Sequence, residues 1–364
     1  MSKKNKKKRG PIRTILRILL ILILVVVIAF GGLLAFITIV EYRPADREDI
    51  EITGTAAKTV KAGDTINFMT WNIGYGALGD NADFFMDGGK MVYTADKERL
   101  DSNLSEIMSV IKSNSPDILY VQEIDRDSSR SKHVNELEMV GDTLGGYSYA
   151  FALNFKDVFM PYPIPPMAKV DSGISTVSSY TMNNAERIQL PCPFSWPIRT
   201  FNLKRCVLIS RIPVEGSDKE LVLVNLHLEA YDDGEGKVEQ TKMLVDILNS
   251  EKEKGNYVIA GGDFNQIFSS ADKSAYPAQP GKWAAGEIDV SMFGEGWSFM
   301  MDSSVPSCRS LDQPYAGADK STFQYYLIDG FIVSDDISVD NFGTQDLDFK
   351  VSDHNPVLMQ VTLK

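Results

Sequence analysis

Polar side chains that bind cations or move protons interrupt several apolar runs of this sequence. Asp263 and Asn265 follow the run "VIAGG", His227 lies inside "VNLHLEA", and Asp329 lies inside "LIDGFIVS". Two of the three histidines in the chain, His227 and His354, belong to this set. Burying such groups without partners costs about 1–3 kcal/mol each. A shared site supplies partners, and we therefore expect these side chains to converge.

Three more residues belong to the same set, two at strand ends and one in a turn. Asn72 ends the run "TINFMTWN", Glu123 ends "PDILYVQE", and Asp353 precedes His354 in "SDHNPV". Carboxylate and amide oxygens suit a hard divalent cation such as Mg²⁺. The sequence has neither a Cys-x-x-Cys nor a His-x-x-x-His pattern, which disfavours zinc. A histidine next to an aspartate suits general-base activation of water, so the set indicates metal-assisted hydrolysis of a phosphoester.

Each residue also has a structural explanation when it is taken alone. Asp263 and Asn265 could form a turn, because short polar side chains bond to nearby backbone groups. His227 could be a core histidine whose hydrogen bonds are satisfied. The collection favours a functional site more strongly than any single member does.

The elements that must position these residues alternate between short apolar strands and amphipathic helices. We predict helices over 96–114 and 238–255, and the following strands: 65–73, 116–124, 220–230, 256–265, 327–334 and 355–363. This order predicts an α/β layered fold with mixed sheets. The segment 154–170 contains four prolines, so we expect a rigid packed loop or an apolar lip beside the substrate or the membrane.

The ordered series "WN", "QE", "NLHLEA", "GDFN", "IDGFIVS" and "SDHNPV" resembles the endonuclease/exonuclease/phosphatase superfamily. That superfamily includes deoxyribonucleases, inositol polyphosphate phosphatases and neutral sphingomyelinases, and the resemblance covers residues 64–364. It implies a four-layer α/β/β/α sandwich with two mixed β-sheets.

The resemblance also implies metal and catalytic roles. Glu123 would be the main Mg²⁺ ligand, with Mn²⁺ as an alternative ion, and Asn72 and Asp353 would lie at the metal. His354 would be the general base, oriented by Asp329. The remaining catalytic residues would position water and phosphoryl oxygens or stabilise the transition state: Asp263, Asn265 and His227.

Three cationic candidates follow Glu123 in "DRDSSRSKH": Arg126, Arg130 and His133. They could grip an anionic group of the substrate or lie on a solvated loop. The chain also departs from many relatives, which carry arginine where Glu239 precedes Gln240, and which carry arginine where Tyr180 follows Ser179.

The N-terminus predicts a membrane anchor. Residues 1–17 carry eight Lys and Arg and no acid, and residues 18–40 form an uncharged apolar run. At about 1.5 Å per residue, 23 residues cross a hydrocarbon core of about 30 Å. A cleaved signal peptide is the alternative, although its apolar region is usually only about 7–15 residues. The basic tail 1–17 should stay in the cytoplasm, which places the catalytic domain outside a bacterial cell membrane.

The remaining organisation is simple: a polar linker over residues 41–63 and one catalytic domain over 64–364. The chain has a net charge of −12 and residues 1–17 contribute +8, so the remainder carries −20. This charge counts against general nucleic-acid binding. We therefore predict a Mg²⁺-dependent phosphodiesterase that acts on a lipid head group, with two alternatives: an extracellular nuclease and an inactive anchored binding module.

Three cysteines allow at most one disulfide and leave one thiol. Buried free thiols are the favoured interpretation for Cys192, Cys206 and Cys308. If one pair is oxidised, Cys192 and Cys206 close the shorter loop.

Overall fold

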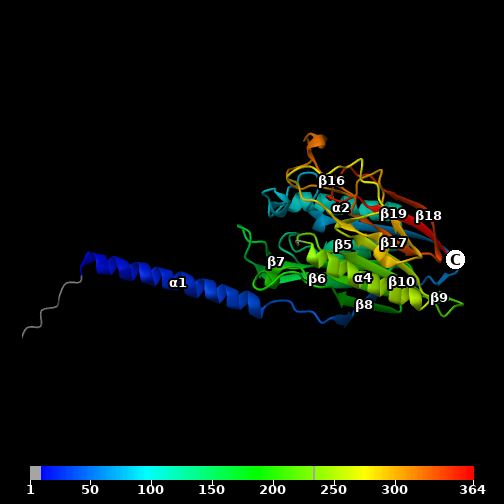
Figure 1. Cartoon of the computed structure of the whole chain (residues 1–364), viewed down its shortest axis with the longest axis horizontal. Helices are drawn as coiled ribbons and strands as arrows, with labels where there is room; N and C mark the ends of the chain where they lie inside the picture. The colour runs from blue at the N-terminus through cyan, green and yellow to red at the C-terminus, as the bar shows by residue number, and fades with distance from the viewer. Residues whose placement is uncertain (1–9, 233) are drawn as a thin grey trace, which may run out of the picture.

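The computed structural model describes residues 10–232 and 234–364. Helix α1 (Pro11–Ile39) projects from a body of two large mixed sheets (Figure 1). Sheet A has the strand order β1 (Arg47–Asp49), β8 (Asn184–Gln189), β9 (Cys206–Glu215), β10 (Glu220–His227), β11 (Tyr257–Asp263), β17 (Asp329–Ser334) and β14 (Trp297–Met300), and β3 (Val60–Lys61) also pairs with β9. Sheet B has the order β18 (Ile337–Thr344), β19 (Val357–Leu363), β4 (Thr65–Asn72), β5 (Ile118–Asp125), β7 (Ala168–Ser178), β6 (Ser148–Met160) and β2 (Ile52–Gly54).

Three helices cover the sheets: α2 (Lys97–Asn114), α3 (Glu136–Thr143) and α4 (Glu235–Glu253). Two small ribbons complete the body: β12 (Gln266–Phe268) with β13 (Gly286–Ile288), and β15 (Cys308–Arg309) with β16 (Tyr325–Tyr326). Five 3₁₀ turns occupy loops: η1 (Gly74–Gly76), η2 (Phe85–Asp87), η3 (Ile198–Phe201), η4 (Val290–Phe293) and η5 (Lys320–Thr322).

In the part of the chain that the structure describes, apolar residues form three large cores, which is what four layers require, and two smaller clusters. One core lies between the sheets and contains Phe68 and Phe331. A second packs sheet B against α2 and α3, and a third packs sheet A against α4. Strand β10 shows the reason, because alternate residues face opposite sides: Leu223 joins the central core, whereas Val222 joins the core under α4. The predicted four-layer sandwich is confirmed.

The local sequence explains where helix α2 begins and which of its faces is buried. The Asp96 side chain accepts a hydrogen bond of 2.8 Å from the backbone N–H of Arg99 and so caps α2. Leu100, Leu104 and Ile107 lie on one face of this helix and are buried. Helix α4 begins at Glu235, three residues before the predicted start.

The predicted linker over residues 41–63 is wrong in part. Strand β1 pairs with β8 in sheet A, β2 pairs with β6 in sheet B, and β3 pairs with β9. Strands of two or three residues are too short to show a period of two, so the sequence pattern did not reveal them. The folded body therefore begins near Arg47 and not at Asp64.

The segment 154–170 also needs correction. Residues through Met160 belong to β6, and residues from Ala168 belong to β7. All four prolines lie between these strands, in the turn 161–167. The prediction of a loop holds for the turn only, because the residues before it have free backbone N–H groups and join the sheet.

Helix α1 begins at Pro11 rather than at residue 18, so Arg13 and Arg17 lie within it and not in a separate tail. Residues 1–9 of the predicted tail lie outside the described residues. Among the described residues, α1 is the one helix that is long and apolar enough to cross a membrane, with a mean hydropathy of 3.3 over an 18-residue window. All three cysteines are free thiols, so no disulfide joins Cys192 to Cys206.

Candidate active site

Strand register in sheet A brings three predicted residues into one row. His227 at the end of β10 lies opposite Asp263 in β11, and Asp263 lies opposite Asp329 in β17. A parallel pair followed by an antiparallel pair places these side chains at the same edge of the sheet. Three residues that are far apart in the chain therefore share one end of sheet A.

Sheet B supplies the facing residues. Asn72 at the end of β4 lies opposite Gln122 in β5. The next residue, Glu123, has a φ of 51° and lies where the β5–β7 register shifts. Such a bulge re-aims a side chain, and here the Glu123 carboxylate lies 3.2 Å from Nδ2 of Asn72.

The loop before β19 places His354. Ser352 Oγ donates to the carbonyl of Asn72 at 2.8 Å and accepts from the backbone N–H of His354 at 3.1 Å. Trp71 Nε1 donates to the carbonyl of His354 at 2.9 Å. These bonds hold the loop against the end of β4.

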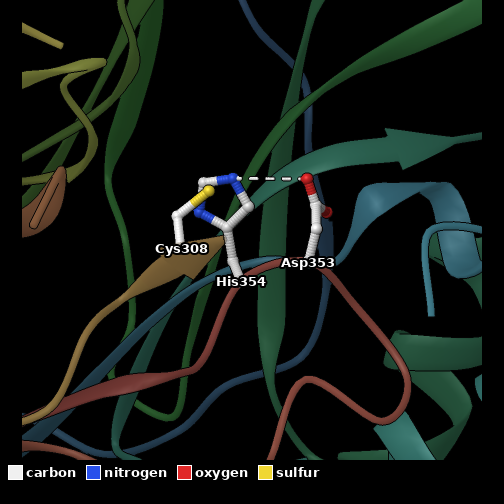
Figure 2. A group of neighbouring side chains, drawn as sticks. All are labelled: Cys308, Asp353 and His354. Atoms are coloured by element: carbon white, nitrogen blue, oxygen red, sulfur yellow. Dashed lines mark ion pairs between the residues drawn. The ribbon is translucent and has the colours of Figure 1, made fainter. Parts of the chain in front are cut away.

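The imidazole of His354 contacts residues from both sheets. Its Nδ1 lies 2.8 Å from Oδ2 of Asp329, and its Nε2 lies 3.8 Å from Asp263 and 3.9 Å from Asp353. Figure 2 shows the ring pointing toward Asp353, with the Cys308 thiol on the ring's other side. One ring nitrogen is therefore held by a carboxylate, while the other faces the remaining polar groups.

Asn72 links the acidic residues. Its Nδ2 donates to Asp263 at 3.0 Å and to Glu123 at 3.2 Å, while its Oδ1 accepts from the N–H of Gly74 at 3.0 Å. This orientation makes Asn72 a donor that positions two carboxylates. Its role as a metal ligand stays a prediction.

Asp263 and Asn265 form both a turn and part of the site. The N–H of Asn265 donates to Oδ1 of Asp263 at 2.9 Å, which is the local turn, while Oδ2 of Asp263 faces Asn72 and His227. Gly262 has a φ of 143°, and a Cβ there would lie 2.0 Å from the carbonyl oxygen of Leu226. The glycine is therefore required for the close approach of β10 and β11.

The pKa values of His227 and His354 are shifted in opposite directions. Burial, followed by the positive charge of Arg205, holds the pKa of His227 well below its ordinary value. Its Nε2 lies 3.4 Å from a carboxylate oxygen of Asp263, so a proton on Nε2 of the neutral ring would point toward that carboxyl group. Burial also acts to lower the pKa of His354, but the charges of Asp329, Asp353 and Asp263 outweigh burial and raise that pKa well above its ordinary value.

The acidic residues around His354 fit a hard divalent cation. Burial and the charge of Asp329 raise the pKa of Asp263 to about 7, and burial and the charge of Glu123 raise the pKa of Asp353 to about 6. Crowded carboxylates of this kind are stabilised when a cation lies between them. Cys308 is a poorer ligand, because burial raises the pKa of its thiol to about 12. Glu123 and Asp353, which both line the cavity, stay the predicted residues that would hold a cation.

The polar residues form one end of a cavity of about 620 Å³. We use the name catalytic floor for six polar residues at or directly behind this end: Asn72, Glu123, His227, Asp263, Asp329 and His354. Four of them line the cavity, as do Asn265 and Asp353, whereas Asn72 and Asp329 contact the lining residues from behind. The predicted catalytic residues and metal ligands thus converge at one place.

Only one of the three predicted cationic contacts lies at the cavity. Arg130 lines it, pairs with Asp125 at 3.0 Å and lies 3.6 Å from the ring centroid of Tyr75. The prediction for the other two is corrected, because neither lines the cavity and each is held by its own carboxylate partner: Arg126 by Asp171 at 2.9 Å, and His133 by Asp127 at 2.6 Å.

Arg205 is a cavity residue that the sequence reasoning missed. It is buried, lines the cavity, and lies 3.7 Å from Glu229. Among the residues that the structure describes, its Nε and Nη1 have no hydrogen-bond partner. An arginine just before an apolar strand gives no sign in the sequence that it will be buried where its charge acts on His227.

The two departures from the resembling family lie outside the cavity lining. Glu239 is exposed and pairs with Lys242 at 2.8 Å, whereas Gln240 is buried and accepts from the N–H of Glu229 at 2.9 Å. Tyr180 packs in the core between the sheets. Neither position contributes a contact to the catalytic floor.

Comparison with known proteins agrees with this geometry. The protein-family model described as the Endonuclease/Exonuclease/phosphatase family matches residues 69–354. Among solved structures, an endonuclease/exonuclease/phosphatase from Beutenbergia cavernae is similar, with 18% identity, a TM-score of 0.57, and coverage of 82% of this chain and 72% of that one. No curated protein matches the chain.

Two further structures share the fold. The human Nocturnin catalytic domain with bound sulfate has 16% identity and a TM-score of 0.51, with coverage of 86% of this chain and 98% of that one. ANGEL2, described as a 2′,3′-cyclic phosphatase in complex with adenosine-2′,3′-vanadate, has 12% identity and a TM-score of 0.53, with coverage of 86% and 98%. The family match, which extends over most of the chain, shows that this protein belongs to the endonuclease/exonuclease/phosphatase family of hydrolases.

Proposed function

We propose that this protein is a Mg²⁺-dependent phosphodiesterase that acts outside the cytoplasmic membrane on the head group of a lipid. The observation that carries the hydrolytic part is the His354–Asp329 pair of 2.8 Å, which faces Asp263 and Asn72. The apolar helix α1 supports the membrane location. The net charge of −20 outside the basic N-terminus supports a lipid over a nucleic acid.

His354 acts as the general base in this proposal. Asp329 holds Nδ1 and stabilises the imidazolium, so Nε2 is the atom that takes the proton of the attacking water. Asp263 lies 3.8 Å from Nε2 and helps to position that water.

The other residues of the catalytic floor act on the phosphoryl group. Neutral His227 donates a hydrogen bond from Nε2 to a phosphoryl or leaving oxygen, and buried Arg205 offsets the substrate's negative charge. Glu123 and Asp353 would hold a divalent cation, which would supply positive charge for the phosphoryl oxygens, make a bound water more acidic and offset the negative charge around His354.

The test is a substrate panel with the purified full chain: a choline phospholipid, plasmid DNA and an inositol phosphate, each with Mg²⁺ and with chelator. We expect hydrolysis of the phospholipid that is lost with chelator and falls by about 10²–10⁴-fold in His354→Ala. Cleavage of DNA without cleavage of lipid would support the nuclease instead. No hydrolysis together with no Mg²⁺ binding would support the binding module.

A further inference from the structure

The cavity above the catalytic floor has an apolar lining. Three of the segments that build it are far apart in the chain: the η2 region, the β6–β7 hairpin and the loop 190–205 between β8 and β9. We use the name apolar wall for six of their residues: Phe84, Phe85, Met160, Met167, Phe194 and Phe201. A cavity of about 620 Å³ is within the usual range for small-ligand sites.

The cavity is polar at the catalytic floor, and most of its other lining residues are apolar, with Asp87, Lys282 and Arg309 among the exceptions. A ligand that fills it must therefore place a phosphate at the catalytic floor and apolar groups against the apolar wall. Binding is favourable when apolar groups of a ligand replace water in an apolar cavity, because this lowers the free energy. The lining favours an amphiphile over an inositol phosphate, which has polar groups on all sides.

One side of the cavity is joined to the end of helix α1. Trp196 in the loop 190–205 donates from Nε1 to Oγ1 of Thr38 at 3.0 Å. Glu41, two residues beyond α1, lies 3.4 Å from Arg199 and 3.2 Å from Lys204 of the same loop. Phe194 and Phe201 of the apolar wall belong to this loop, so the wall is attached to the end of the apolar helix.

Exposed apolar residues lie on the same segments. Trp196 and Ile198 in the loop 190–205 are half exposed, and Tyr162 and Ile164 at the tip of the β6–β7 hairpin are more exposed still. Figure 1 shows α1 on the side of the body opposite the C-terminus. Aromatic and aliphatic side chains next to a membrane helix are typical of the membrane–water boundary.

We propose that the cavity receives an acyl chain of a membrane lipid that is lifted from the bilayer around α1, while the lipid phosphodiester lies at the catalytic floor. The inference rests on the proposed phosphodiesterase function and names its substrate class. Contacts with the apolar wall then make binding depend on the length of the acyl chain. The loop 190–205 provides a short path from the bilayer to the cavity.

The first experiment varies chain length. Lysophosphatidylcholines of increasing acyl length, each below its critical micelle concentration, are supplied to the full chain in amphipol with Mg²⁺. We expect kcat/KM to rise about fourfold for each added methylene until the chain fills the cavity. A kcat/KM that does not depend on chain length would overturn the inference.

The second experiment changes the cavity lining. Ile198 lines the cavity and is 49% exposed, so Ile198→Glu places a carboxylate there without opening the core. We expect kcat/KM to fall at least about tenfold for the longest substrate and less than about twofold for the shortest. Val238→Glu on α4 is the matched control, because Val238 is 47% exposed and lies outside the cavity. Equal losses in both variants would count against the cavity.

A binding measurement separates this inference from the proposed function. Calorimetry with the same lysophosphatidylcholines and His354→Ala measures affinity without turnover, and we expect the same dependence on chain length and the same loss in a protein that also carries Ile198→Glu. If bis(p-nitrophenyl) phosphate is hydrolysed in a His354-dependent manner but chain length has no effect on affinity, only the cavity inference fails. If no phosphodiester is hydrolysed, the proposed function fails and this inference fails with it.

Discussion

The catalytic floor and the apolar wall are neighbours that are built in different ways. The floor consists of residues at strand ends and beside them, and strand register fixes where they lie, as with His227 opposite Asp263. The wall consists of residues from 3₁₀ turns, a hairpin and a long loop, which come together only through tertiary packing. If the proposed function holds, the chemistry would depend on the floor and the substrate selectivity on the wall, because a change in the wall need not move the floor.

The largest effect is expected from a change in the floor. Asp329→Asn removes the carboxylate that holds Nδ1 of His354 and stabilises its protonated form. We expect kcat to fall by about 10²–10⁴-fold for every substrate, short or long. The control is Asp335→Asn, because Asp335 is an exposed carboxylate just beyond the same strand. A loss confined to long-chain substrates would contradict the separation of floor and wall.

Glu123→Gln tests the predicted cation. We expect at least about a 100-fold loss of activity at fixed Mg²⁺, since even residues that support a metal ligand contribute about 10–100-fold. Paramagnetic resonance of bound Mn²⁺ gives a readout that does not depend on turnover and should show weaker binding. Glu239→Gln on the exposed side of α4 should change neither quantity.

Arg205→Leu tests the buried cation at the junction of floor and wall. We expect kcat/KM to fall by about 10–100-fold, mainly through a higher KM, because a charged hydrogen-bond donor to the substrate is lost. Arg126→Leu is the control, because Arg126 is paired with Asp171 away from the cavity. An unchanged KM together with a lower melting temperature would indicate that Arg205 is only structural.

The smallest effect concerns a pair outside both regions. Burial acts to raise the pKa of Glu251, but its contacts with Arg211 and Lys254 lower that pKa to about 2. Because the pKa of the folded state lies below the unfolded value of about 4.3, the stabilisation is complete above pH of about 4.3 and is lost as the pH falls toward 2.

Glu251→Gln should therefore lower the free energy of unfolding at neutral pH by about 1–2 kcal/mol, a value reduced for solvent screening. Thermal unfolding from pH 7 to about pH 2 measures this, and the variant should show a shallower loss of stability on acidification. Its kcat and its chain-length dependence should match the unaltered protein. A changed kcat would show that sheet A transmits distortion to the floor.

The floor could be predicted from the sequence because buried polar residues at strand ends are costly without partners. Asp263 and His227 interrupt apolar runs and His354 lies in a polar turn just before one, and that conflict is visible in one sequence. The wall could not be predicted in the same way. Phe194 and Phe201 are ordinary apolar residues in a loop, and nothing in their spacing shows that they face a cavity.

The positions of the charged residues could be predicted only in part, because they too depend on tertiary packing. The sequence places Arg126 and Arg130 four positions apart, but only the structure shows that Arg126 pairs with Asp171 whereas Arg130 lies at the cavity. The burial of Arg205 could not be predicted from the sequence, because it depends on packing between distant segments. The short edge strands β1 and β2 were missed because two or three residues carry too little periodicity.

Those edge strands have a consequence for how the body can be separated from its helix. Residues 47–54 close one margin of each sheet, so a protease that cuts between Tyr42 and Ala45 would release an intact body, whereas a cut beyond Gly54 would strip both margins at once. The second product would present unpaired backbone groups of β8 and β6 to solvent and would be prone to self-association. Proteolytic release of the body with both sheet margins intact is therefore confined to a window of a few residues just after helix α1.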